Sequence, residues 1–138
     1  MEVVNQVMPD MERAMAFFDA AEDGPFVMVN LLKFKPQAEY EDGSDGQLTG
    51  AEAYLRYGEE VRKLVEGLGG KVRYSGAVTG LMIGEVEELW DMVALAEYPS
   101  LEAFRNMAMS AEMHAIEHHR KAGLAGQLNI RTKPGVGF

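Results

Sequence analysis

The segment Phe26–Phe34 restricts the fold of this chain more than any other. Apart from Asn30, its side chains are apolar at both odd and even positions as far as Leu32. Successive side chains of a β-strand point to opposite faces, so neither face of this strand would be polar. Such a run predicts a central strand that is covered on both sides.

The other periodic stretches predict three helical regions and three further strands. The helices are expected at residues 10–22, 49–68 and 101–121, the last with a break near Ser110. The strands are expected at residues 71–83, 89–98 and 124–132, the first two forming a hairpin through residues 84–88. Thr49 and Glu52 have the spacing of a capping box, and Asp10 and Ser110 are typical N-cap residues.

After the N-terminal helix, the order of these elements is βαββαβ. It predicts an α+β, ferredoxin-like fold, with a four-stranded antiparallel sheet and two helices on one face. The length of 138 residues fits one domain. Within it we expect an added N-terminal helix at residues 10–22, a core at 24–132 and an acidic loop at 36–50. Two helices cover one face of such a sheet, so a second copy of the chain is the simplest cover for the other.

Composition excludes several classes of function. The chain has 13 basic and 22 acidic side chains, a formal net charge of −9, which disfavours nucleic acid and anionic membranes as partners. It has no cysteine, which excludes disulfides, thiolate metal sites and a cysteine nucleophile. The N-terminal residues do not resemble a secretory signal, and no apolar run approaches the ~20 residues of a membrane-spanning helix. We therefore expect a cytoplasmic protein.

Five stretches of the sequence resemble one bacterial family. They are DGPFVMVNLLKF at residues 23–34, GAEAYLRY at 50–57, GGKV at 69–72, AEYPSLEAF at 96–104 and SAEMHAIEHHR at 110–120. Together they resemble the domain-of-unknown-function family numbered thirteen-thirty, over roughly residues 24–132. The N-terminal helix and the acidic loop look like additions found in one branch of that family.

This resemblance implies a place among the dimeric α/β barrels, in which two ferredoxin-like sheets pack face to face. That superfamily includes cofactor-free monooxygenases, lactone isomerases and haem enzymes. The resemblance therefore implies a homodimer joined through its sheet faces more firmly than it implies any reaction.

The histidines are the first candidates for chemistry. His114 and His118 are four residues apart, so on a helix they share a face, and Glu117 could add a third metal ligand. The alternative is that these polar residues form a solvated face, with positive charge at the negative end of the helix dipole. We favour that alternative, and expect neither a metal nor a bound cofactor.

The candidate ligand-binding residues are Asn30, Tyr54, Tyr57, Trp90 and Arg120. Arg120 falls on or beside the apolar stripe of its helix, where it could clamp an anionic group or simply cover the edge of the core. The aromatic residues could line a hollow beside small residues of the sheet, or pack in the core.

Asn30 is the one polar side chain within Phe26–Leu32. Either it bonds to the backbone or a neighbouring side chain, or its amide faces a pocket and orients a ligand. We favour the second account narrowly, which predicts that Asn30→Leu keeps or raises the melting temperature.

Two classes of function follow, and the sequence leaves both open. The first is a protein that binds a small apolar molecule with an anionic or carbonyl group, including an oxygenase- or isomerase-type enzyme without a cofactor. The second is a non-catalytic dimeric binding or regulatory protein with a filled core. A further alternative is haem or metal binding through the histidine cluster.

Overall fold

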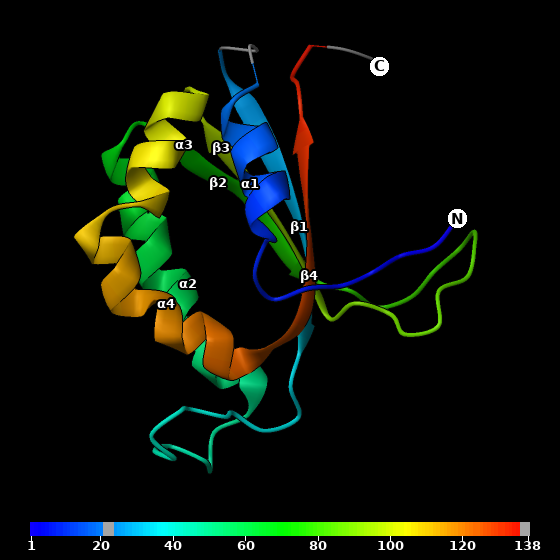
Figure 1. Cartoon of the computed structure of the whole chain (residues 1–138). Helices are drawn as coiled ribbons and strands as arrows, with labels where there is room; N and C mark the ends of the chain where they lie inside the picture. Colours follow the sequence, from blue (N-terminus) through cyan, green and yellow to red (C-terminus); the bar gives the residue numbers. More distant parts are fainter. Residues whose placement is uncertain (21–23, 136–138) are drawn as a thin grey trace.

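The computed structural model describes residues 1–20 and 24–135. The chain forms α1 (Met11–Phe18), β1 (Phe26–Phe34), α2 (Gly50–Gly67), β2 (Lys71–Ala77), β3 (Met92–Tyr98), α3 (Leu101–Ala108), α4 (Ala111–Gly123) and β4 (Leu124–Thr132). All neighbouring strands are antiparallel, and their order in the sheet is β2-β3-β1-β4. The helices lie on one side of the sheet (Figure 1). The predicted α+β, ferredoxin-like fold with its four-stranded antiparallel sheet is confirmed.

The helix starts follow the local sequence signals. The Thr49 hydroxyl accepts a hydrogen bond from the Glu52 amide at 3.1 Å, and the Glu52 carboxylate accepts one from the Thr49 amide at 2.9 Å. Ser110 caps α4, which splits the predicted helix 101–121 into α3 and α4 as expected. Asp10 caps α1 through the Arg13 amide at 2.8 Å. Helix α1 ends at Phe18, with Asp19 as its C-cap, so it is shorter than the predicted helix 10–22, whose expected end lies outside the described residues.

The connection between β2 and β3 is longer than the predicted hairpin. Pairing ends at Ala77 and begins again at Met92, so residues 78–91 form a loop. Asp91 fixes the end of this loop against both neighbouring strands. Its amide donates to the Leu32 carbonyl and its carboxylate accepts from the Phe34 amide, both at 2.8 Å, while its carbonyl accepts from the Val78 amide at 2.9 Å.

The two faces of β1 have different surroundings, although both are apolar. Phe26, Met28 and Leu32 face the helices and are 5%, 4% and 0% exposed. Val29 and Leu31 point to the opposite face, on which Val29 pairs with Leu95 and Ile130 while Leu31 pairs with Val93 and Leu128. These residues are only partly buried or, for Ile130, exposed.

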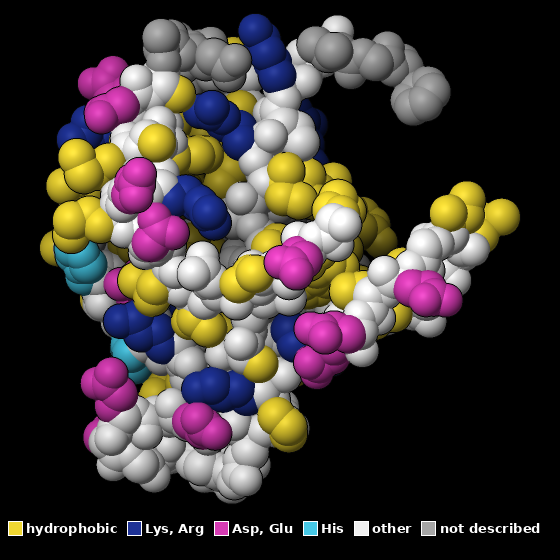
Figure 2. Space-filling model, turned by 45° about the vertical axis from the view of Figure 1, so that its right-hand side comes forward, with side chains coloured by type: hydrophobic (Ala, Val, Ile, Leu, Met, Phe, Trp, Pro, Cys, Tyr) yellow, Lys and Arg dark blue, Asp and Glu magenta, His cyan; other side chains and the backbone are white. Residues whose placement is uncertain are grey.

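The N-terminal segment crosses β4 and ends beyond the sheet, next to the loop of residues 78–91 (Figure 1). Figure 2 shows hydrophobic side chains gathered between this segment and the body of the molecule. Within the described residues, no helix has the length and apolarity needed to cross a membrane.

Candidate functional site

Three polar side chains, linked by hydrogen bonds, connect α4 to the middle of the sheet. Arg120 Nη2 donates a hydrogen bond to Gln127 Oε1 at 2.6 Å, and Gln127 Nε2 donates one to Asn30 Oδ1 at 2.8 Å. Asn30 Nδ2 in turn donates to the carbonyls of Ala94 at 3.2 Å and Met28 at 3.4 Å. The direction of each bond is fixed, because the guanidinium donates only and therefore orients the Gln127 amide.

The fold brings these residues together by two short steps. β4 begins directly after α4, so the chain reverses and lays Gln127 beside the last turn of the helix. Gln127 pairs with Leu32 on β1, which places its side chain on the same helix-facing side as Asn30.

Two tyrosines of α2 lie near these three hydrogen-bonded side chains. The ring centroids of Tyr54 and Tyr57 are 5.4 Å apart, and the Phe34 ring lies 5.3 Å from Tyr54. Burial raises the pKa of both tyrosines, while the positive charge of Arg120 acts on each pKa in the opposite direction. Both phenols therefore stay protonated at neutral pH, beside a permanent cation.

A close helix crossing permits this arrangement. A Cβ atom at Gly123 would lie 2.4 Å from the Gly50 carbonyl oxygen and 2.9 Å from the Tyr54 amide nitrogen. Because glycine has no side chain, the end of α4 can approach the start of α2 to that distance. Arg120, one turn earlier on α4, is thereby held near both tyrosines.

Arg120 has no acidic partner among the described residues. The ion pairs found there involve other arginines and lysines, whereas Arg120 Nη1 lies 3.6 Å from the sulfur of Met8. A thioether is a weak hydrogen-bond acceptor, so it leaves most of the charge of the guanidinium uncompensated. A partly buried arginine of this kind suits a carboxylate or a polarised carbonyl.

The structure brings together four of the five predicted site residues. Asn30 and Arg120 are joined through Gln127, and Tyr54 and Tyr57 come under the charge of Arg120. Trp90 is elsewhere, in the loop of residues 78–91. Its indole nitrogen donates to Asn5 Oδ1 at 2.7 Å.

Sequence reasoning missed Gln127 and Met8. A signal for Gln127 was present, because the helix-facing positions of β4 are Gln127, Asn129 and Arg131, all polar where a covered strand is usually apolar. The sequence carried no comparable signal for Met8.

Two of the histidines of α4, His118 and His119, lie beside Tyr40 in the loop that precedes α2. His119 Nδ1 and the Tyr40 hydroxyl are 2.7 Å apart, and the rings of His118 and His119 are 3.9 Å apart. Burial, His118 and Arg56 together lower the pKa of His119. No group of three His, Cys, Asp or Glu side chains in the described part of the chain is placed to hold a metal ion.

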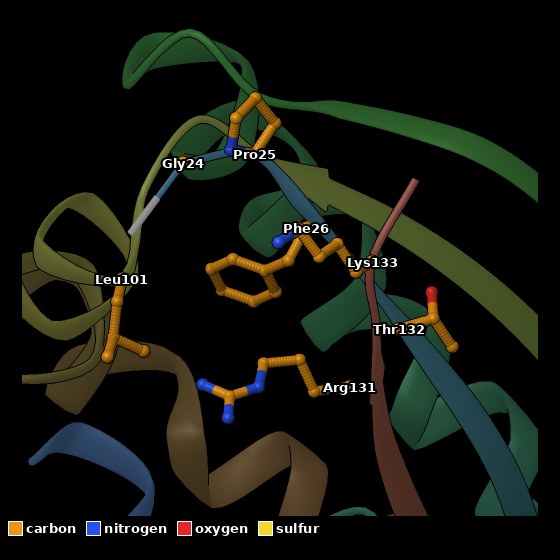
Figure 3. A pocket seen from close by; sticks show the side chains of 7 residues that line it. All are labelled: Gly24, Pro25, Phe26, Leu101, Arg131, Thr132 and Lys133. Carbon is orange, nitrogen blue, oxygen red and sulfur yellow. The ribbon is translucent and has the colours of Figure 1, made fainter. Parts of the chain in front are cut away.

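A separate hollow of about 210 Å³ lies where β1 begins and β4 ends (Figure 3). The Phe26 ring and Leu101 form apolar walls, and the Arg131 guanidinium extends across it. Arg131 also lies 4.8 Å from the centroid of the Phe17 ring, a cation–π distance. This hollow is a second cation-lined feature of the helix-facing side.

Fold and site together define a ferredoxin-like α+β protein with a polar cluster between its sheet and helices. No known family profile and no curated protein matches the sequence. The chain belongs to the same family as the RPA0582 protein of Rhodopseudomonas palustris, a protein of unknown function. That crystal structure is 37% identical, covers 95% of this chain and 98% of its own, and has a TM-score of 0.85.

A more distant similarity supports the fold alone. It is to a dimeric ferredoxin-like protein of unknown function from Thermobifida fusca YX. That protein is 14% identical, with coverage of 79% of this chain and 90% of its own and a TM-score of 0.52.

Proposed function

We propose that this protein binds a small, largely apolar molecule through a carboxylate or carbonyl group at Arg120. The observation that carries the proposal is the state of that arginine. It is partly buried, oriented by Gln127 at 2.6 Å, and without an ion-pair partner in the described residues. A partly buried cation that is held in one orientation favours an anionic ligand over water more than a fully exposed and mobile one does.

The neighbouring residues have distinct roles in this proposal. Tyr54 and Tyr57 provide apolar ring surface and phenol groups that remain protonated, which can donate hydrogen bonds to a ligand oxygen. The Tyr57 hydroxyl has the Met113 sulfur as a weak partner at 3.7 Å. Asn30 is a positioning residue, because its amide holds Gln127 rather than the ligand.

Catalysis is the second candidate function. A cation and a protonated phenol on one carbonyl oxygen would polarise that group, as an isomerase- or oxygenase-type reaction without a bound cofactor requires. The raised pKa of Tyr54 and of Tyr57 keeps both phenols protonated and disfavours either tyrosine as a general base.

We further propose that the protein is a homodimer joined through the sheet face opposite the helices. Val29, Leu31, Val93, Leu95 and Ile130 give that face a continuous apolar surface. The Thermobifida protein of the same fold is described as dimeric. Assignment to the family numbered thirteen-thirty, within the dimeric α/β barrels, is likewise a proposal, supported by the sequence stretches given above.

Native mass spectrometry of the purified protein tests the binding function. The wild type is expected to carry an acidic or carbonyl-containing molecule that Arg120→Gln lacks. Arg62→Gln is the control, because Arg62 is exposed on α2 and, among the described residues, its ion pair is with Glu66. A bound molecule retained equally by Arg120→Gln would show that the site lies elsewhere.

A further inference from the structure

Residues 5–8, which we call the N-terminal strap, lie across the edge strand β4 next to Arg120. The Gln6 amide donates to the Gln127 carbonyl at 3.2 Å, and the Asn5 side chain packs over Gly126. Trp90 holds Asn5 through the indole hydrogen bond at 2.7 Å, and Met8 supplies the sulfur 3.6 Å from Arg120. Figure 1 shows this segment passing in front of β4.

The strap is held by contacts that can be exchanged at little cost. Its pairing with β4 is a single isolated bridge rather than a ladder. Gln6 is exposed, and so is the hydrogen bond between Trp90 and Asn5, which water can replace. The sulfur of Met8 is a weak acceptor for a guanidinium.

Met8 occupies the side of Arg120 that a ligand would need. Nη2 is engaged by Gln127, whereas Nη1 faces the thioether. Met8 combines an apolar side chain with a weak acceptor, and is 44% exposed. An apolar molecule that carries a carboxylate likewise combines an apolar part with a hydrogen-bond acceptor, and its acceptor is far stronger than a thioether.

We propose that the N-terminal strap gates the Arg120 site, and that an apolar carboxylate opens it by replacing the Met8 sulfur at Arg120 Nη1. The inference rests on the proposed function. A ligand can shift a conformational equilibrium only if its affinity differs between the two states, which here are the closed and the open strap. With the strap closed, the ligand meets a guanidinium that already has a thioether. With the strap open, the Nη1 group is available to donate hydrogen bonds to the carboxylate.

The chain carries its own reporter of the strap. Trp90 is the single tryptophan, and its indole bonds to the strap through Asn5. Opening breaks that bond and leaves the indole to water. We therefore expect hexanoate, which does not absorb where tryptophan does, to shift the emission of Trp90 to longer wavelength. The midpoint should equal the dissociation constant from calorimetry, and hexanamide, with the same tail and no charge, should give at least tenfold weaker binding.

Two variants loosen the strap without touching the ligand contacts. Gln6→Pro removes the amide that donates to Gln127, and Met8→Ala removes the sulfur from Arg120. Each should bind hexanoate several-fold more tightly, because less of the binding free energy is spent on opening. Gln6→Pro should also show the shifted emission before hexanoate is added. Met11→Ala is the control, since Met11 is 79% exposed on α1.

The outcomes separate this inference from the proposed function. Hexanoate binding with unchanged Trp90 emission, and with wild-type affinity in both variants, would overturn the gate and leave the Arg120 site standing. No hexanoate binding to the wild type or to either loosened variant would overturn both. If Gln6→Pro fails to fold, the affinity of Met8→Ala for hexanoate and its Trp90 emission decide the question.

Discussion

Gln127 accepts a hydrogen bond from Arg120 at 2.6 Å through its side-chain oxygen, and donates one to Asn30 through its side-chain nitrogen. This pair ties the last turn of α4 to β4 and fixes the orientation of the one cation that the candidate site depends on. Its removal should therefore affect both the site and the stability of the fold.

Gln127→Leu tests that role. Leucine has similar bulk but leaves Arg120 and Asn30 Oδ1 without their partner, which should lower the free energy of unfolding by about 1–3 kcal/mol. Affinity for hexanoate should fall by tenfold or more, because Arg120 loses its fixed orientation. Denaturant unfolding and calorimetry measure the two effects. The control is Asn129→Leu, at an exposed position on the same strand, which should change neither the stability nor the affinity. Wild-type affinity in Gln127→Leu would show that Arg120 does not need Gln127 to orient it.

Asn30→Leu should destabilise the protein. Both amide hydrogens of Asn30 bond to backbone carbonyls, and its oxygen accepts from Gln127. Leucine would leave these partly buried groups unpaired, at a cost of about 1–3 kcal/mol. The sequence alone favoured the opposite result, because it could not show that the backbone already satisfied the amide. A melting temperature at or above that of the wild type would restore the ligand-facing interpretation.

His119 should make stability depend on pH. Because its pKa is lowered from the ordinary value of 6.5, the unfolded chain binds a proton at a higher pH than the folded protein does. Stability should therefore fall as the pH drops below 6.5, through the lowered pKa. His119→Asn should flatten this dependence in urea titrations between pH 7 and pH 5. An equal slope in wild type and His119→Asn would assign the dependence to other groups.

The apolar sheet face should make the protein dimeric. Sedimentation at micromolar concentration should give about twice the chain mass of 15.2 kDa. Leu95→Lys should convert the dimer to monomer without unfolding it, because this side chain is only partly buried in the single chain. Met109→Lys, at a position 66% exposed among the helices, is the control. A single 15.2 kDa species in the wild type would contradict the sheet-face dimer.

The sequence predicted the order of elements because its local signals agreed with the tertiary structure. The Thr49 capping box, the Ser110 break and the two-sided apolar strand all identify features of the observed fold. The full length of the loop of residues 78–91 was not predicted, because its end is fixed by long-range bonds from Asp91 to β1. The strap could not be found from the sequence for the same reason. Its partners Gln127, Arg120 and Trp90 are more than 80 residues away.

Calorimetric titration of hexanoate into the wild type and Arg120→Gln measures whether the guanidinium binds the carboxylate. We expect saturable binding to the wild type, an affinity at least tenfold lower in Arg120→Gln, and wild-type affinity in Arg62→Gln. Equal affinity in the wild type and Arg120→Gln would show that the carboxylate is bound without the guanidinium, and that Arg120 is not the binding residue.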